Sequence, residues 1–394
     1  MAEELLPSPH PLTPPRSEDD WVTWFRLLRS RRVGPTTFHR LISEHGTAAD
    51  ALAALPEVAR AAGVERYAPC PIEVAQEELR QGRLAGAVPL AIGDPAYPAL
   101  LSELSDAPPV LWCLGDPALL DRRLVALVGA RNASSLGTRM AKSLAEGLTS
   151  AGFAVVSGLA RGVDTAAHLA ALKGGTIAVQ AGGVDVIYPA ENAVLAQEIA
   201  ERGLRLSEQP MGMQPQARHF PARNRIISGL VQAVVVVEAA AKSGSLITAR
   251  SALDQGREVM SVPGHPFDGR AAGCNMLIRD GATLVRGPAD VVEALTAAPM
   301  PLRQARTADT AVAAAADSPD GSPPAPRRDP PRRPLAEVAA LHGQILDRLG
   351  PSPVAEDQLI RDLNAPAGAV GAELVTLELE GRIERRPGGL LART

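Results

Sequence analysis

Residues 124–170, LVALVGARNASSLGTRMAKSLAEGLTSAGFAVVSGLARGVDTAAHLA, decide the fold, because they contain two successive units of a strand, a glycine turn and a helix. The apolar run at 124–128 is typical of a buried parallel strand, and it stops at Gly129. Serines then provide a helix cap, and apolar side chains follow at four-residue spacing. The second unit repeats this order, with a strand that ends at Gly158 and a helix that begins near Val163.

The alternation of strands and helices continues to about residue 298. Further strands are expected at TIAVQAGG (176–183), LRLSE (204–208), AVVVVEA (233–239), REVMSVPG (257–264) and ATLV (282–285). The clearest helices between them are ENAVLAQEIAERG, SLITARSALDQGR and GCNMLIRDG. Strands that alternate with helices of this length predict an α/β domain with a doubly wound, mostly parallel sheet.

The first glycine turn argues against a dinucleotide cofactor. Its sequence, Gly129-Ala130-Arg131, lacks the GxGxxG pattern, and no acidic residue stands just after the second strand to hold a ribose hydroxyl. No phosphate-binding loop with a Walker lysine is present either. We therefore expect no cofactor and no ATP hydrolysis.

Composition and length indicate a soluble protein of two or three domains, since 394 residues exceed what one core usually supports. The first twenty residues are acidic and proline-rich, which excludes a signal peptide, and the longest apolar stretch, 226–241, is interrupted by polar residues. We expect a cytoplasmic protein with no membrane partner. Three widely spaced cysteines fit a reduced compartment and predict neither a disulfide framework nor a zinc site.

The formal net charge of -4 hides an uneven distribution. Residues 120–298 contain 18 Lys and Arg against 15 Asp and Glu, whereas residues 335–394 contain 6 against 9. Only three basic residues of the chain are lysine. Phosphate contacts in the central region would therefore fall mainly to arginine, whose planar fork matches phosphate geometry.

Five segments are expected along the chain: a disordered tail at 1–17, a helical domain at 18–85, the sheet domain at 86–298, a Pro/Ala-rich linker at 299–334 and a C-terminal domain at 335–394. Within the sheet domain, 86–119 is expected to be a proline-punctuated connection that places Leu111 and Trp112 in the sheet edge.

The two terminal domains favour contacts with protein over contacts with DNA. The helical domain resembles a helix-hairpin-helix or SAM-like unit, but acids and bases nearly balance over residues 17–90, at 10 against 9. The C-terminal domain is expected to form three helices and a small wing that turns at Gly388-Gly389. Its third helix carries acidic residues where a DNA-reading helix should be basic, namely Glu373, Glu378 and Glu380.

Four segments place anion-binding chemistry at the carboxyl ends of strands, where loops meet helix N-termini. They are Gly129 to Arg131, Ser157 to Asp164, HFPARNRIISG (219–229) and KSGSLITAR (242–250). Arginines supply bidentate phosphate contacts, Asn224 can bridge phosphate to backbone, and Phe220 offers a face for a base. This mixture favours single-stranded nucleic acid over a small anion.

Structural roles compete with these assignments. The glycines can serve only as tight turns, Phe220 can be core, and the arginines can pair with acids such as Glu208 or Glu238. Asp164 and His168 lie one helical turn apart, but no nucleophile is placed beside them, so we interpret the pair as structural. No histidine has metal-ligand spacing. We predict no catalytic residue and no metal.

The ordered motifs VALVGAR, SGLARGVDTAAH, AGGVDVIYPAEN, SEQP, HFPARNRIISGL, VVVEAAAKSGSLITA and VPGHP with GCNMLIRDGA resemble the DprA/Smf family of bacterial DNA-processing proteins, over about residues 90 to 290. The resemblance implies an extended Rossmann-like domain that binds and protects single-stranded DNA. It also implies a homodimer through that domain and help in loading a RecA-type recombinase, in natural transformation (competence) or in general recombination. A SAM-like domain before it and a winged-helix-like domain after it are common in the family.

The resemblance also implies a set of DNA- or phosphate-binding residues. They are Gly129, Arg131, Ser157, Gly158, Arg161, Gly162, Phe220, Arg223, Asn224, Arg225, Ser243 and Gly244, beside which Lys242 completes the last loop. Phe220 matches a base-stacking position. The family's lysine three residues before that phenylalanine is Ala217 here, and the neighbouring Arg218 is the candidate replacement.

Two other classes of protein stay open. An enzyme resembling the LOG-type phosphoribohydrolases would need a PGGxGTxxE motif, and this chain has SGSLITARS without the glutamate. A structural scaffold for recombination proteins would bind no nucleic acid. The interpretation favoured by the sequence is a non-enzymatic mediator.

Overall fold

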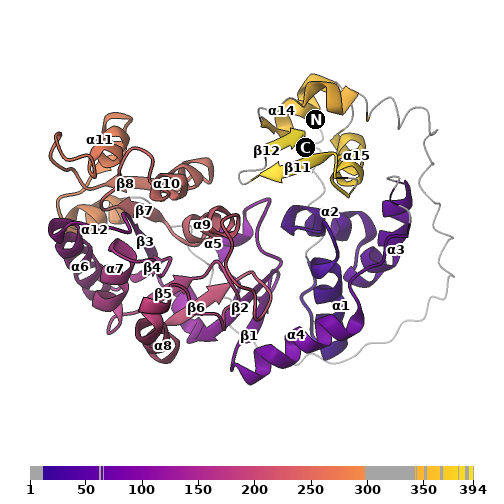
Figure 1. The fold of residues 1–394 in the computed structure, drawn as a ribbon, viewed down its shortest axis with the longest axis horizontal. Coiled ribbons are helices and arrows are strands. Elements are labelled where there is room, and N and C mark those ends of the chain that lie inside the picture. The colour runs from indigo at the N-terminus through magenta and orange to yellow at the C-terminus, as the bar shows by residue number, and fades with distance from the viewer. Residues whose placement is uncertain are drawn as a thin grey trace, which may run out of the picture.

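The computed structural model describes residues 12–61, 64, 66–297, 342, 344–349, 353–363, 367–379, 381–386 and 390–393. Figure 1 shows a large sheet flanked by helices, a group of N-terminal helices and a small C-terminal unit beside that group. The expected linker at 299–334, Glu380 and the Gly388-Gly389 turn lie outside the described residues. No helix of the described ranges is long and apolar enough to cross a bilayer.

The N-terminal domain consists of four helices, α1 (Glu18–Arg29), α2 (Pro35–His45), α3 (Ala48–Ala61) and α4 (Ile72–Leu84). Ser17 caps α1 in a capping box with Asp20. Residues from these helices are fully buried in a shared core, among them Phe25, Leu27, Phe38, Leu41 and Leu55. Leu12 also packs against this core, so a disordered tail over residues 1–17 is wrong for Leu12.

Nine strands form the central sheet in the order β1-β2-β6-β5-β4-β3-β7-β8-β9. Their bounds are β1 (Val88–Ala91), β2 (Val110–Gly115), β3 (Leu124–Val128), β4 (Ala154–Ser157), β5 (Thr176–Val179), β6 (Leu204–Ser207), β7 (Ala233–Val236), β8 (Glu258–Ser261) and β9 (Thr283–Leu284). All neighbouring strands from β6 to β9 pair in parallel, whereas β1 and β2 add two antiparallel pairings. The predicted α/β class with a doubly wound, mostly parallel sheet is confirmed.

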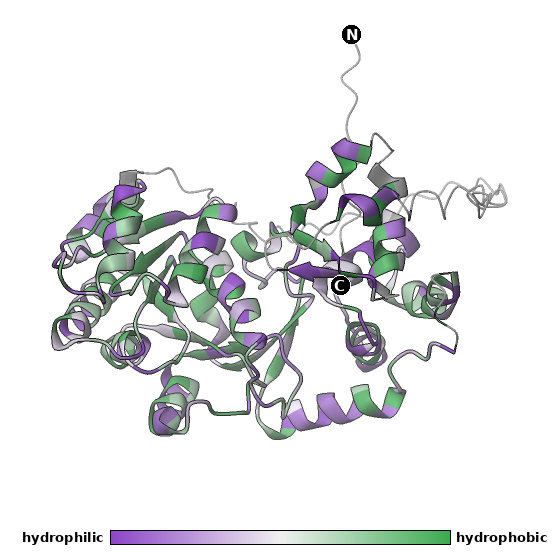
Figure 2. Cartoon of the chain, turned by 45° about the horizontal axis from the view of Figure 1, so that its top comes forward, coloured by the Kyte–Doolittle hydropathy of each residue, from purple (hydrophilic) through white to green (hydrophobic). Residues whose placement is uncertain are grey.

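Helices cover both faces of this sheet, which is why most residues of its strands are apolar. Val125 and Leu127 of β3 pack in one core with α6 (Ser135–Ser150), α7 (Val163–Ala171) and α12 (Pro288–Ala297). Leu124 and Ala126 point to the other face. The remaining helices are α5 (Ala99–Ser102), α8 (Ala193–Arg202), α9 (His219–Leu230), α10 (Ser245–Asp254) and α11 (Ala272–Arg279), with short 3₁₀ turns at Pro117–Asp121 and Ala190–Asn192. Figure 2 shows the apolar sheet interior and the polar outer faces of the helices.

The segment 86–119 is more regular than expected, because it supplies two strands of the sheet. Trp112 lies on β2, which is next to the edge strand β1, and is buried; its indole Nε1 donates a 2.9 Å hydrogen bond to Glu78 Oε1 of α4. Its ring stacks on Phe25 with centroids 5.4 Å apart. Arg29 pairs with the same Glu78 at 2.7 Å. The sheet and the helical domain therefore share one core and one buried ion pair.

The C-terminal unit contains α14 (Glu356–Leu363), α15 (Ala367–Leu379) and a sheet of β10 (Val354–Ala355), β12 (Leu390–Arg393) and β11 (Ile383–Arg386). Its own core includes Leu359, Leu374 and Leu391. The unit lies against the N-terminal helices in Figure 1.

The acids of α15 serve packing and contact between domains. Glu373 accepts a 2.6 Å hydrogen bond from His342, and Glu378 accepts from Thr37 Oγ1 of α2 at 3.0 Å and from Arg385 Nε at 3.1 Å. Arg40 of α2 pairs with Glu356 and donates to the Gly371 carbonyl at 3.0 Å. The third helix thus faces the helical domain, and its acids Glu373 and Glu378 support contacts within the chain.

Candidate functional site

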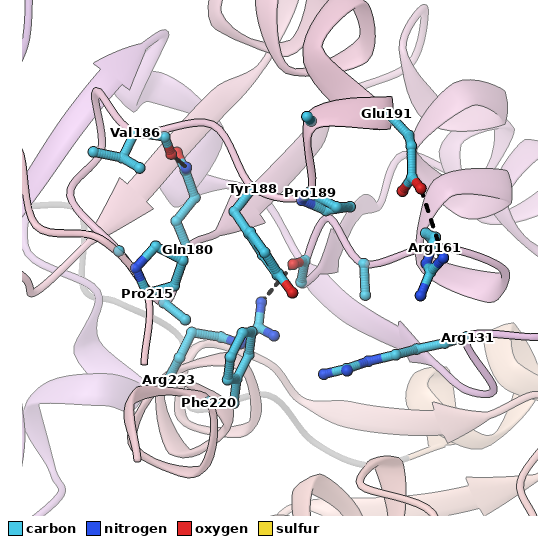
Figure 3. Close-up of a pocket in the computed structure, with 15 residues that line it drawn as sticks. Arg131, Arg161, Gln180, Val186, Tyr188, Pro189, Glu191, Pro215, Phe220 and Arg223 are labelled. Atoms are coloured by element: carbon cyan, nitrogen blue, oxygen red, sulfur yellow. Dashed lines mark hydrogen bonds and ion pairs between the residues drawn. The ribbon is translucent and has the colours of Figure 1, made fainter. Parts of the chain in front are cut away.

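A cavity of about 290 Å³ opens at the carboxyl ends of β3, β4 and β5. The loops after these strands form one wall, and α9 forms the other. In Figure 3 the side chains of Arg131, Tyr188, Phe220 and Arg223 lie around this cavity. We call it the cradle.

Glycines allow two loops of the cradle to pack closely. Gly162 has φ of +76°, and a Cβ there would overlap the Ala130 carbonyl oxygen. A Cβ at Gly129 would lie 2.6 Å from Val163 Cγ2. Val163 N donates to Ala130 O at 3.2 Å, which joins the loops after β3 and β4. These two glycines therefore shape the wall of the site.

The loop after β4 is held by a buried carboxylate. Asp164 Oδ2 accepts hydrogen bonds from Gly158 N at 3.1 Å and Ala160 N at 3.3 Å. Burial raises the pKa of Asp164, and the nearby Arg223 guanidinium opposes this shift. Because Asp164 takes these backbone donors, the loop does not offer those two N–H groups to a phosphate.

His168 supports the same loop as a neutral ring. Leu159, at φ of +56°, donates its backbone N–H to His168 Nε2 at 3.3 Å. Thr176 Oγ1 donates its proton to Val155 O at 3.0 Å. It must therefore act as the acceptor in its 2.7 Å contact with His168 Nδ1, which carries the ring proton. Burial lowers the pKa of His168 to about 3. Asp164 and His168 bind separate partners rather than each other, and both have the structural roles that we predict.

Arg223 provides a fixed positive charge at the floor of the cradle. It is only 6% exposed, and its Nη1 donates to Gly158 O at 2.5 Å and Val179 O at 2.6 Å. Its Nε donates to Asn224 Oδ1 at 3.2 Å. Burial lowers the pKa of Arg223 to about 10, which keeps the group charged at neutral pH. The sequence places this arginine near a strand end, and the structure places it on α9.

Arg225 points away from the cradle, contrary to the family-based prediction. It pairs with Glu208 and donates to Asp106 O at 2.5 Å, with the Asp106 carboxylate 3.6 Å away. Positions two residues apart on a helix face different directions, because each residue turns the helix by about 100°. The structural alternative, in which these arginines pair with an acid such as Glu208, therefore holds for Arg225. It does not hold for Arg223, whose bonds go to carbonyl oxygens and Asn224.

The mouth of the cradle combines an exposed arginine with two aromatic rings. The exposed guanidinium of Arg131 lies 5.3 Å from the centroid of the Phe220 ring. The Tyr188 ring lies 5.8 Å from the Phe220 ring and is 50% exposed. Arg161 is exposed and lies 3.6 Å from Glu191. Tyr188 was not predicted, although its motif AGGVDVIYPAEN places it after a strand.

Other predicted residues lie outside the cradle lining. Ser157 is buried and donates to Leu127 O at 2.7 Å. Arg218 is exposed at the start of α9, with Nε 3.4 Å from His219 Nε2. The loop of Lys242, Ser243 and Gly244 precedes α10 and does not line the cavity. Ser243 Oγ instead contacts Ser245 Oγ at 2.7 Å.

The N-terminus of α6 already holds an anion of the protein itself. Glu238 accepts from Ser134 N at 3.0 Å and from Ser134 Oγ at 2.5 Å. A Cβ at Gly137 would lie 2.5 Å from Glu238 Oε2. In dinucleotide-binding folds the pyrophosphate sits at this helix N-terminus. A pyrophosphate here would meet the Glu238 carboxylate.

A Rossmann-like domain between a helical domain and a winged helix, with arginines and aromatic rings around one cavity, defines a class of nucleic-acid-binding protein. The family described as DNA recombination-mediator protein A matches residues 89–296, the DprA-like N-terminal HHH domain matches 18–80, and the DprA winged helix domain matches 329–389. The chain belongs to the DNA recombination-mediator protein A family.

Relatives and solved structures agree with this assignment. The chain is 38% identical to Protein Smf of Synechocystis sp. over 311 residues, which is 75% of this chain and 77% of that protein. It is 47% identical to the DNA processing protein DprA of Streptococcus pneumoniae over 204 residues, 51% of this chain and 72% of the relative.

The X-ray structure of DprA from S. pneumoniae matches with a TM-score of 0.55 and 38% identity, and covers 66% of this chain and 86% of that chain. A Helicobacter pylori structure, described for the single-stranded DNA binding mode of its DNA processing protein A, has a TM-score of 0.50 and 32% identity, with 54% and 96% coverage.

Proposed function

We propose that this protein binds single-stranded DNA in the cradle, with phosphates held by arginines and a base stacked on an aromatic ring. The observation that carries the proposal is the position of the Arg131 guanidinium 5.3 Å from the Phe220 ring at the mouth of a charged cavity. Base stacking on aromatic rings and phosphate contacts to arginine are the two interactions that single-strand binders combine.

The shape of the cradle favours a single strand over a duplex. A cavity of about 290 Å³ accepts a nucleotide-sized group and cannot enclose a double helix. Stacking on Phe220 or Tyr188 needs a base whose face is free, which a duplex does not offer. Arg223 is locked by carbonyl oxygens, so it supplies charge without the entropic cost of ordering a free side chain.

The family suggests what DNA binding by this protein is used for, namely mediation of recombination. Membership of the recombination-mediator family supports a role in which the protein protects single strands, acts as a homodimer through its Rossmann-like domain, and loads a RecA-type recombinase in transformation or general recombination. A non-enzymatic role is supported by Asp164 and His168, whose polar atoms are taken up by loop support.

Fluorescence anisotropy of labelled single-stranded and duplex oligonucleotides at two salt concentrations tests the binding. Arg131→Ala and Phe220→Ala should weaken single-strand binding, while Arg202→Ala, an exposed arginine at the end of α8, serves as a matched control. Equal affinity of all variants would move the site elsewhere. Failure of the wild type to bind would overturn the proposal and favour a scaffold, and release of free base from nucleoside monophosphates would favour the enzyme.

The recombinase step needs a separate measurement. Nucleation of a RecA-type filament on single-stranded DNA should become faster when wild-type protein is added, and less so with Arg131→Ala. No acceleration by a protein that binds DNA normally would refute the loading role.

A further inference from the structure

A second cleft, of about 480 Å³, lies on the same edge of the sheet as the cradle. Its walls are the N-terminal half of α6 and the loop 262–271 that follows β8. Leu136, Met140 and Val262 provide apolar lining, and Arg139 and His265 provide polar groups. This cleft includes the N-terminus of α6, where Glu238 lies, and shares no lining residue with the cradle.

Backbone hydrogen bonds connect the cradle to this cleft without a gap. Val163 N donates to Ala130 O at 3.2 Å, and Ala130 N donates to Glu238 O at 2.7 Å. Gly273 N then donates to Ala239 O at 2.8 Å. The loops after β4, β3, β7 and β8 thus form one continuous rim. Strands in a sheet are about 4.8 Å apart, so three spacings place the two clefts within about 15 Å.

The loop beside the second cleft presents an aromatic ring to solvent. Phe267 is 94% exposed, and its ring centroid lies 5.6 Å from that of His265, which lines the cleft. Three of the five phenylalanines of the chain, Phe25, Phe38 and Phe153, are buried. The other two are Phe220 in the cradle and Phe267 at the second cleft.

Hydrogen bonds fix the loop that carries Phe267. Gly264 N donates to Asn275 Oδ1 at 3.1 Å, and Asn275 Nδ2 donates to Gly264 O at 3.0 Å. Asp268 N donates to His265 O at 2.9 Å, and Phe267 N to His265 Nδ1 at 3.3 Å. The backbone that carries the exposed ring is therefore held in place, which lowers the entropic cost of ordering this loop when a base stacks on the ring.

Arg139 supplies an exposed cation in the lining of the cleft. It is exposed on α6, and no ion pair is recorded for it in the part of the chain that the structure describes. Arg286, which also lines the cleft, pairs with Asp290 at 2.7 Å. Two acids line the cleft: Glu238 is turned towards Ser134, and Asp268 pairs with Arg270 at 3.2 Å. The cleft thus has an exposed arginine in its lining and an exposed aromatic ring on the loop that forms one of its walls.

We propose that the second cleft is a further nucleotide subsite for the same DNA strand, in which a base stacks on Phe267 and Arg139 binds a phosphate. The strand would leave the cradle and follow the rim across the ends of β3 and β7. This inference rests on the proposed single-strand binding and extends it to a second point of contact.

Length-dependent binding tests the second subsite. Anisotropy is measured with a dT oligomer of about 2 nucleotides, which at about 3.4 to 7 Å per nucleotide cannot span the distance of about 15 Å between the clefts, and with one of about 15, which can reach both clefts. Phe267→Ala and Arg139→Ala should each weaken binding of the longer oligomer by about 5- to 150-fold and leave the shorter one unchanged. Phe267→Trp should retain binding, because it keeps a stacking surface. Leu253→Ala, an exposed leucine on α10, is the control.

The outcomes separate the two proposals. If Phe267→Ala binds both oligomers like the wild type while Phe220→Ala weakens both, the second subsite is wrong and the cradle stands. If Phe267→Ala weakens both oligomers equally, the cleft is no separate subsite. If the wild type binds neither oligomer, single-strand binding itself fails and the second subsite fails with it.

Discussion

The arginines of α9 and the arginines of the cradle loops have the same side chain and opposite surroundings. Arg223 and Arg225 are 6% and 5% exposed and are held by carbonyl oxygens or carboxylates. Arg131 is exposed at the mouth, and so is Arg161, although its Nη1 lies 3.6 Å from Glu191 Oε1. A buried arginine whose donors are satisfied stabilises the scaffold, whereas an exposed one keeps its donors for a ligand. In the motif HFPARNRIISGL, both arginines, at positions 223 and 225, are of the buried kind.

The largest difference between the two groups is expected in stability. Arg225→Ala leaves the Glu208 carboxylate buried without its cation, and such a loss costs about 3–5 kcal/mol. Arg131→Ala removes an exposed side chain and should change the free energy of unfolding by less than about 0.5 kcal/mol. Urea unfolding of both variants measures the contrast. Equal midpoints would show that the Arg225 network does not support the fold.

The next largest effect is the pH dependence of stability that comes from the buried His168 behind the cradle loop. Burial lowers the pKa of His168 from 6.5 to about 3, so between these values the unfolded chain binds a proton that the folded chain does not. Stability contributed by the neutral ring is thus present above pH 6.5 and is lost as the pH falls, by about 1.5 to 2 kcal/mol between pH 6.5 and 5.

Urea unfolding at several pH values measures this loss. Asp164 acts in the opposite direction, because burial raises its pKa and its contribution favours folding at lower pH. The difference between wild type and His168→Gln isolates the histidine. A wild-type profile parallel to that of His168→Gln would contradict the neutral, buried ring.

Removing an exposed arginine of the cradle is expected to have a smaller effect, which appears in the affinity for DNA. Arg131→Ala should raise the Kd for single-stranded DNA about tenfold, which is about 1.4 kcal/mol. It should also reduce the slope of log K against log salt by about 1, because one phosphate contact fewer releases counterions. An unchanged slope with weaker binding would mean that Arg131 contacts the base or Phe220 rather than phosphate.

The smallest effect tests the contact between the terminal domains. Thr37→Val keeps the shape of the buried side chain and removes its hydrogen bond to Glu378, at a cost of about 1 kcal/mol. Glu378→Gln made alone and with Thr37→Val completes a double-mutant cycle. Additive effects of the two changes on the unfolding free energy would show that this bond has no coupling energy.

Local pattern predicted the sheet and the loops, because strands of a parallel sheet are continuous apolar runs and end at glycine turns. Gly158, Arg131 and Phe220, which the sequence places at loops and at a helix near strand ends, line the cradle, and Gly129 packs behind its wall; their contact with DNA stays a prediction. β1 was missed because a four-residue edge strand that contains Pro89 has no distinctive pattern.

Long-range pairing set the limits of prediction. The direction of Arg225 depends on Asp106, which is 119 positions away in the chain, and on Glu208. Local spacing holds no information on such partners. Likewise, nothing in the loop of Lys242 and Ser243 shows that it turns away from the cradle, since helix N-termini in one sheet domain look alike in sequence.

The contact between α2 and α15 has a consequence for biosynthesis. Thr37 and Glu378 are 341 positions apart, so the face of α2 that meets α15 stays uncovered until nearly the whole chain has left the ribosome. At about 5–20 residues per second this interval lasts about 17 to 70 s. During that time the buried face around Thr37 is open to other proteins, and a chaperone that binds it would delay the closing of the chain upon itself.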